Sequence, residues 1–147
     1  KLKNKEYDAI VLSLAGIQML NLTNEVKEIF TIQQMLPAIG QGAIALQCKK
    51  DDQKTLNTLK TINDKETYYC IQAERALLEA IGGDCDTAIG GLAKLSNDKI
   101  SLKSELFSND GKKKFEFQSS GSLSEAKEIG YKVGKELLKK AGSDFTT

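Results

Sequence analysis

The chain has 147 residues, of which 40% are hydrophobic and 28% are charged, and its formal net charge is +1. This composition is typical of a folded globular protein, and the near-neutral charge gives no reason to expect binding to nucleic acid or to a membrane surface. Histidine is absent, which excludes His-based triads and imidazole metal sites, and three cysteines at spacings that fit no metal motif favour a reducing, cytoplasmic compartment. All but one of the 21 basic residues are lysines, so Arg75 is the only residue able to grip a carboxylate with a bidentate fork.

The first predicted element is a strand over Tyr7–Gly16, where an almost continuous apolar run is typical of a parallel strand buried on both faces. Only a lysine-rich hexapeptide precedes it, so we expect its neighbouring strands to lie upstream and the chain to be truncated. A short helix is expected around Glu25–Phe30. A second strand is expected over Ala43–Cys48, and Gly40 and Gly42 would allow close backbone approach at its start. Because these glycines enter a strand, they match neither a dinucleotide fingerprint nor a P-loop.

From Asp51 onward the pattern becomes self-contained and predicts an α+β domain. Apolar residues at helical spacing and capping residues define its helices. Alternating apolar and polar residues define its strands, and turn-forming residues separate them. The predicted elements are helices over 51–61 and 64–81, strands over 87–95, 100–106 and around 115–117, turns at 97–98 and 109–111, and a last helix opened by the capping box Ser122-x-x-Glu125 and ending before Gly142. The three strands should form an antiparallel sheet packed by helices.

Cys85 stands apart because it lies in the predicted loop between the long helix and the first of these strands. Function tends to concentrate in such loops, and glycines on both sides leave room for a bulky partner. The helix C-terminus, Asp84 and Asp86 work against an activated thiolate. From the residues alone, Cys85 is therefore either an ordinary loop cysteine or a thiol that reacts once with a strong electrophile.

Four blocks resemble, in order and spacing, the C-terminal part of hydroxymethylbilane synthases (porphobilinogen deaminases), including the third domain of that family. The similarity covers nearly the whole chain from Tyr7. The blocks are Tyr7–Leu12 followed by Ala15-Gly16, Leu36–Ala43, Ala73–Ala76, and Gly82–Cys85 followed by Ile89-Gly90.

This resemblance implies an enzyme that condenses four porphobilinogen units into a linear tetrapyrrole and releases ammonia at each addition. It implies that Cys85 carries a dipyrromethane cofactor through a thioether, that Gln41 contacts the cofactor, and that Ser13 and Gly16 line the cleft. Because the acidic catalytic residue and most carboxylate-binding arginines would lie upstream, we expect no catalytic residue in this chain and no activity from it alone. The parent protein is expected to be a cytoplasmic monomer that binds neither nucleic acid nor membrane.

On the same resemblance, residues 1–49 would be α/β segments: the end of the second domain and a strand returning to the first. Residues 50–147 would be the cofactor-carrying α+β domain. The chain also departs from the family pattern. Gln18 and Met19 replace its usual basic pair, Asp84 replaces the usual glycine before the cysteine, and Ala88 replaces the usual proline after it.

Two alternatives stay open from the residues alone. The first is a small α+β interaction module without chemistry, in which Cys85 is incidental. The second is one lobe of a solute-binding protein, suggested by the parallel-type first strand. We also expect Cys48 and Cys70 to be structural, and Glu74 and Arg75 to form an ion pair that could steady the loop bearing Cys85.

Overall fold

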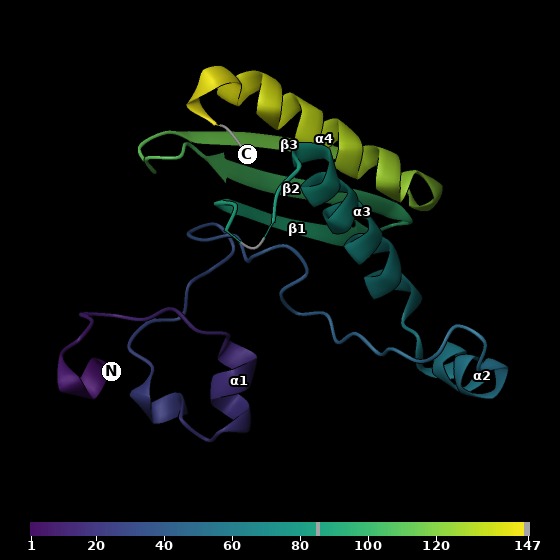
Figure 1. The fold of residues 1–147 in the computed structure, drawn as a ribbon, viewed down its shortest axis with the longest axis horizontal. Helices are drawn as coiled ribbons and strands as arrows, with labels where there is room; N and C mark the ends of the chain where they lie inside the picture. Colours follow the sequence, from purple (N-terminus) through teal and green to yellow (C-terminus); the bar gives the residue numbers. More distant parts are fainter. Residues whose placement is uncertain (85, 146–147) are drawn as a thin grey trace. The chain divides into compact units, whose positions relative to one another are not determined.

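The computed structural model describes residues 1–84 and 86–145. The chain divides into two compact units, Lys1–Gln34 and Met35–Thr147. Helices and a three-stranded antiparallel sheet make up the second unit (Figure 1), which confirms the predicted α+β class.

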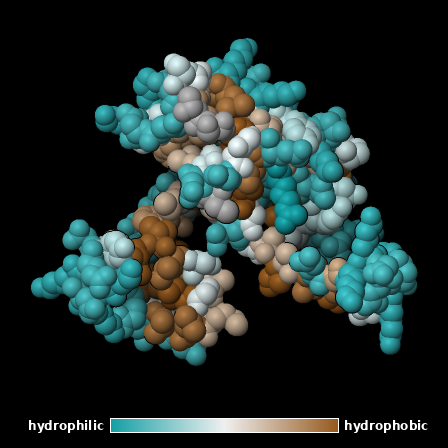
Figure 2. Space-filling model, in the orientation of Figure 1, coloured by the Kyte–Doolittle hydropathy of each residue, from teal (hydrophilic) through white to brown (hydrophobic). Residues whose placement is uncertain are grey.

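The N-terminal unit consists of short helical turns joined by irregular backbone. Its elements are η1 (Leu2–Asn4), α1 (Leu14–Met19) and η2 (Thr23–Glu25). None of its residues is buried, and Met19 is 84% exposed. Figure 2 shows hydrophobic residues gathered on the surface of this unit. The unit therefore has no hydrophobic core of its own.

Three local predictions for the first half of the chain are wrong. Residues 1–49, all of which the structure describes, contain no strand, so neither Tyr7–Gly16 nor Ala43–Cys48 is one, and α1 begins inside the first of them at Leu14. Apart from α1, both segments run irregularly, and they expose apolar side chains such as Ile44, which is 91% exposed. A strand is held by hydrogen bonds to a neighbouring strand, and none lies beside either segment within 1–49. The helix expected at Glu25–Phe30 is also absent, and the 3-10 turn η2 (Thr23–Glu25) ends where that helix was expected to begin.

Two capped helices open the regular part of the C-terminal unit, close to their predicted bounds. Helix α2 (Gln53–Ile62) follows Asp52, whose carboxylate accepts a hydrogen bond from the Thr55 N–H at 3.0 Å. Helix α3 (Lys65–Ile81) follows Asp64, which accepts from the Thr67 N–H at 2.7 Å. These caps satisfy N–H groups that have no partner within the helix.

The sheet is an antiparallel meander with strand order β1-β2-β3. Its strands are β1 (Ile89–Ser96), β2 (Lys99–Phe107) and β3 (Lys114–Ser122). Asn97 and Asp98 both have positive φ and form the predicted two-residue turn between β1 and β2, as tight hairpins with right-handed twist require. The predicted alternation in the second strand is also confirmed, because Ile100, Leu102, Ser104 and Leu106 are all fully buried.

Helix α4 (Ala126–Ala141) closes the core together with α3. It follows η3 (Leu123–Glu125), where Ser122 and Glu125 form the predicted capping box, and it leads into η4 (Gly142–Asp144). Figure 1 shows α3 and α4 packed on the same face of the sheet. The buried core residues come from both helices and from β1 and β2, and they include Leu77, Leu102, Val133 and Leu137. Partly buried Phe115 and Phe117 of β3 pack against them.

Candidate functional site

The loop from α3 to β1, in which the sequence places Cys85, is ordered by bonds among its flanking residues. Gly82 ends α3 in the left-handed conformation with φ of 71°, which suits glycine. The Asp84 N–H donates to Thr87 Oγ1 at 2.9 Å, and Asp84 Oδ1 accepts from the Asp86 N–H at 2.9 Å. Cys85 itself lies outside the described residues. Asp84 and Asp86 are exposed, so the described flanks of this loop face solvent.

Gly83 is required by the packing of this loop. A Cβ atom at Gly83 would lie 2.9 Å from Leu78 Cδ1 and 2.9 Å from Thr87 Oγ1. The Thr87 hydroxyl also lies 3.3 Å from Asp84 Oδ1. The aspartate that departs from the family pattern therefore has a local role, because its carboxylate holds the backbone of the turn.

Gln41 lies in a tight turn that precedes α2 in the sequence. Gly40 adopts φ of 71°, and the Gln41 N–H donates to the Ala38 carbonyl oxygen at 3.1 Å. The Gln41 side chain is exposed and lines an open cavity of about 400 Å³. The other walls of the cavity come from α3 and β1, and include Glu66, Cys70, Glu74 and Leu92–Leu95.

Glu74 is the charged residue that joins these walls. Its side chain projects from α3, and the residue is only 4% exposed. One carboxylate oxygen accepts from the Gly40 N–H at 2.7 Å and the other from the Ala93 N–H of β1 at 2.9 Å. Burial raises the pKa of Glu74, an effect that the two N–H donors oppose. Because the carboxylate accepts two N–H bonds, it joins the turn, the helix and the strand at one point.

The outer edge of β1 is closed by groups that act in place of a fourth strand. The Gly91 N–H donates to the Pro37 carbonyl oxygen at 2.9 Å, and the Ala93 N–H donates to Glu74. Cys70 also lies beside this edge, and the pKa of its thiol is raised mainly by burial, an effect that the Leu95 backbone opposes. Satisfied N–H groups along an edge strand prevent unwanted pairing with other chains.

The predicted site residues fall in both compact units. Ser13 precedes α1 as its N-terminal cap residue, and Gly16 lies within α1 with open space where a side chain would be. Both belong to the N-terminal unit, whereas Gln41 and the flanks of Cys85 belong to the C-terminal unit. Within the C-terminal unit, the structure places Gln41 beside the β1 and α3 residues that line its cavity.

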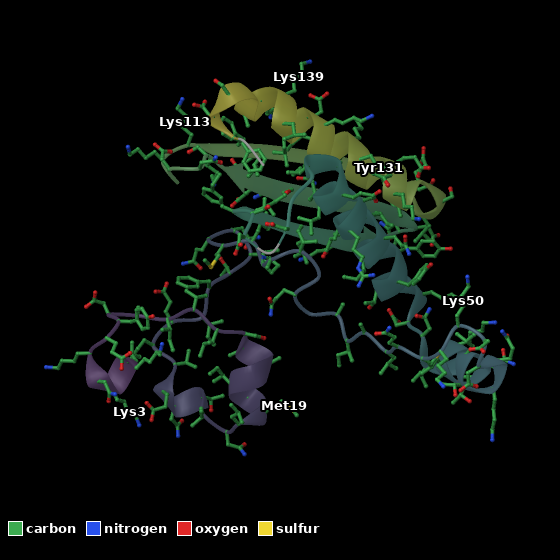
Figure 3. All side chains as sticks on the ribbon, viewed as in Figure 1. Lys3, Met19, Lys50, Lys113, Tyr131 and Lys139 are labelled. Atoms are coloured by element: carbon green, nitrogen blue, oxygen red, sulfur yellow. The ribbon has the colours of Figure 1, made fainter. Side chains whose placement is uncertain are left out.

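The ion pair predicted between Glu74 and Arg75 is wrong. Glu74 and Arg75 form no ion pair with each other, and the Glu74 carboxylate bonds backbone N–H groups instead. The available signal was position, because Glu74 lies one helical turn from both Cys70 and Leu77 on the half-buried side of α3. A carboxylate in such a stripe needs hydrogen-bond donors, but their identity depends on segments distant in sequence. Elsewhere on α3, exposed Glu79 accepts from the Tyr131 hydroxyl of α4 at 2.7 Å. Figure 3 labels Tyr131 on its helix.

Metal-binding clusters and membrane-spanning helices are both absent from residues 1–84 and 86–145. Those residues contain no group of three or more His, Cys, Asp or Glu side chains arranged to hold a metal ion. No helix among them has both the length and the apolar character needed to cross a bilayer.

Comparison with known proteins assigns the chain to a family. Residues 1–57 match the family model described as "Porphobilinogen deaminase, dipyromethane cofactor binding domain", and residues 68–139 match "Porphobilinogen deaminase, C-terminal domain". A porphobilinogen deaminase of Coxiella burnetii is 42% identical over 145 residues, covering 99% of this chain and 47% of the relative. One from Nitrobacter hamburgensis is 36% identical over 147 residues, covering 100% and 46%.

The helix–sheet architecture defines an α+β protein. The chain belongs to the porphobilinogen deaminase family. It spans about half the length of the curated relatives it matches.

Proposed function

We propose that the protein containing this chain condenses four porphobilinogen units into a linear tetrapyrrole on a dipyrromethane cofactor attached to Cys85. Family membership is the observation that carries this proposal, because one matching model is named for dipyrromethane binding and the relatives are named porphobilinogen deaminase. Cys85 lies in the segment matched by the C-terminal family model. Gln41, Ser13 and Gly16 are the further residues that we propose to contact the cofactor or line the cleft.

The residues around Cys85 suit a covalent attachment made once. A thiol can form a carbon–sulfur bond to the aminomethyl carbon of porphobilinogen as that carbon loses ammonia, and the thiol proton leaves with the amine. The described flanks of the loop are exposed, which would give a bulky pyrrole access. Asp84 and Thr87 hold the turn on either side of the cysteine. When bound, the dipyrromethane supplies the anchored pyrrole to which further units are added.

The same residues do not suit tight binding of carboxylated pyrroles. Asp84 and Asp86 repel carboxylates at close range, and Arg75 is the only arginine of the chain. Gln18 and Met19 stand where the family pattern has a basic pair. We therefore propose that the cations for the substrate and the acidic catalytic residue come from sequence outside these 147 residues, and that the chain alone makes no tetrapyrrole.

The domain division, the compartment, the oligomeric state and the partners that we propose all follow from the family resemblance. We propose residues 1–49 as segments shared with two other domains and residues 50–147 as the cofactor-carrying domain. The complete protein would be a cytoplasmic monomer that takes porphobilinogen as substrate and binds no nucleic acid. The near-neutral charge supports the absence of nucleic-acid binding. Three cysteines at spacings that fit no metal motif support a reducing, cytoplasmic compartment.

Acidic Ehrlich's reagent, which colours pyrroles, tests the proposal. The protein should be expressed with whatever coding sequence flanks the chain in its gene, purified under denaturing conditions and treated with the reagent. We expect colour from the wild type and none from C85S, while the matched variants C48S and C70S keep it. A colourless wild type, or a coloured C85S, would contradict the proposal and favour an interaction module with an incidental cysteine.

A further inference from the structure

The buried carboxylate of Glu74 has a specific geometric task. Its two oxygens accept hydrogen bonds from two backbone segments, at Gly40 and at Ala93, which lie 34 and 19 residues away in the sequence. None of the ion pairs among the described residues includes Glu74. Removing a carboxylate from water costs free energy. Hydrogen bonds from backbone N–H groups offset part of this cost, and they order the backbone segments that donate them.

The segment that Glu74 holds is otherwise fixed only upstream of Gln41. The Gly91 N–H bonds the Pro37 carbonyl oxygen, and Leu36 packs close to Gly90. Ile39, directly before the turn, is half-buried and packs against the core. From Gly40 onward the turn bonds Glu74 through the Gly40 N–H, and Gln41 itself is exposed. Loss of the Glu74 carboxylate would therefore release the turn that carries Gln41 while leaving its upstream anchor in place.

Helix α3 connects the same carboxylate to the loop of Cys85. Glu74 lies two helical turns before the end of α3 at Ile81, and Gly82 then starts the loop. On its other side, Glu74 bonds β1, the strand into which the loop leads. The Glu74 side chain therefore bonds both the Gln41 turn and β1, the strand after the loop, and it projects from α3, the helix before the loop.

We propose that Glu74 is a positioning residue for the cofactor site, holding Gln41 in a fixed place relative to the loop that bears Cys85. The inference rests on the proposed function, which makes Cys85 the attachment point and Gln41 a cofactor contact. Glu74 touches neither substrate nor cofactor in this account, and it acts through the Gly40–Gly42 turn.

The hydrogen bonds are tested first, by amide exchange in the 147-residue chain. E74Q replaces one acceptor oxygen with an NH2 group, so one of the two N–H groups loses its partner. The bond from Ala93 is buried and the bond from Gly40 only partly so, and an unpaired buried donor costs more, so we expect the amide oxygen to stay with Ala93 and the Gly40 N–H to lose its acceptor. We expect the Gly40 amide to exchange about tenfold faster in E74Q, the effect of losing one net hydrogen bond. The matched control E79Q removes a carboxylate from an exposed position of the same helix and should leave Gly40 exchange unchanged. Equal Gly40 exchange in wild type and E74Q would overturn the inference.

The positioning role is tested by a double-mutant cycle in the protein expressed with its flanking sequence. Turnover of porphobilinogen is measured per molecule carrying dipyrromethane, counted by intact mass on the same sample, for wild type, E74Q, Q41A, E74Q/Q41A and the control E79Q. We expect E74Q to lower kcat about tenfold, in keeping with the sensitivity of catalysis to small misplacements. Because Glu74 acts through Gln41, the double variant should be no slower than Q41A.

Each outcome of the cycle supports or overturns the inference. Full activity per loaded molecule in E74Q, or effects of E74Q and Q41A that multiply, would show that Glu74 does not act through Gln41. If E74Q fails to fold, E74D takes its place, because it keeps a carboxylate that is too short to reach both N–H groups. A wild type that carries no dipyrromethane overturns the proposed function and the inference with it, whereas a loaded wild type with an equally active E74Q overturns the inference alone.

Discussion

At the scale of single residues, Glu74 gives the domain a stability that depends on pH. Its ordinary pKa is 4.5, and burial raises the pKa in the folded state. Just above pH 4.5 the folded protein therefore binds more protons than the unfolded chain, so this residue's contribution to stability falls as pH rises. The two backbone donors reduce this effect without reversing it.

The direction of this pH dependence can be measured by comparing wild type with E74Q, because the glutamine side chain does not titrate. Urea unfolding at several pH values gives the free energy of unfolding of each protein, and the difference isolates Glu74 because the other groups are shared. We expect wild type to lose stability relative to E74Q as pH rises from 4.5 to neutral. A difference that stays constant, or that moves in favour of wild type, would contradict a raised pKa.

Cys85 and Glu74 show what the sequence could predict about the site. The loop position of Cys85, between helix and strand, follows from local signals that the structure confirms on both sides, at Gly82 and at β1. The partners of Glu74 could not be predicted, because Gly40 and Ala93 reach it only through the tertiary fold. Local signals therefore predicted the loop, the family resemblance singled out its cysteine, and only the three-dimensional arrangement shows the hydrogen-bond partners of Glu74.

At the scale of elements, the contact between α3 and α4 depends on two glycines one helical turn apart on α4. A Cβ atom at Gly130 would collide with the Ala73 carbonyl oxygen and lie 2.7 Å from Ala76 Cβ. At Gly134 it would lie 2.6 Å from Ala80 Cβ. The helices approach closely only because these positions lack side chains.

We predict that G130A destabilises the protein by about 1–3 kcal/mol, the usual cost of forcing extra volume into a packed interior. Alanine favours helix more than glycine does, so a loss of stability would report the clash and not helix propensity. K135A, on the exposed side of the same helix, should change stability by less than about 0.5 kcal/mol. Thermal or urea unfolding measures both, and an unchanged or raised stability in G130A would exclude the tight helix contact.

Elements with strong local signals were predicted well, and elements that depend on distant partners were not. The aspartate cap of α3, the Asn97-Asp98 hairpin and the Ser122 capping box each involve residues a few positions apart. The strands expected at Tyr7–Gly16 and Ala43–Cys48 need neighbours to pair with, and an apolar run alone cannot supply them. The same runs remain as exposed hydrophobic surface.

At the scale of the whole molecule, the two compact units differ in what holds them together. The C-terminal unit has a buried core shared by α3, α4 and the sheet, whereas no residue of Lys1–Gln34 is buried. Segments with few buried contacts open most readily and are cut first by proteases. Brief trypsin digestion should therefore cut first after the lysines of residues 1–34, the last of which is Lys27, and leave a resistant fragment that begins at Glu28. First cuts within 65–141, found by mass spectrometry of the fragments, would contradict this division.

The central claim is that the sulfur of Cys85 permanently holds a dipyrromethane, and the intact mass of the protein tests it most directly. The protein is purified with its flanking coding sequence, and its mass is compared with the mass calculated from that sequence. We predict an excess equal to one dipyrromethane in wild type and in C70S, and a mass equal to the calculated value in C85S. A wild-type mass without the excess, or an excess that persists in C85S, would contradict the account.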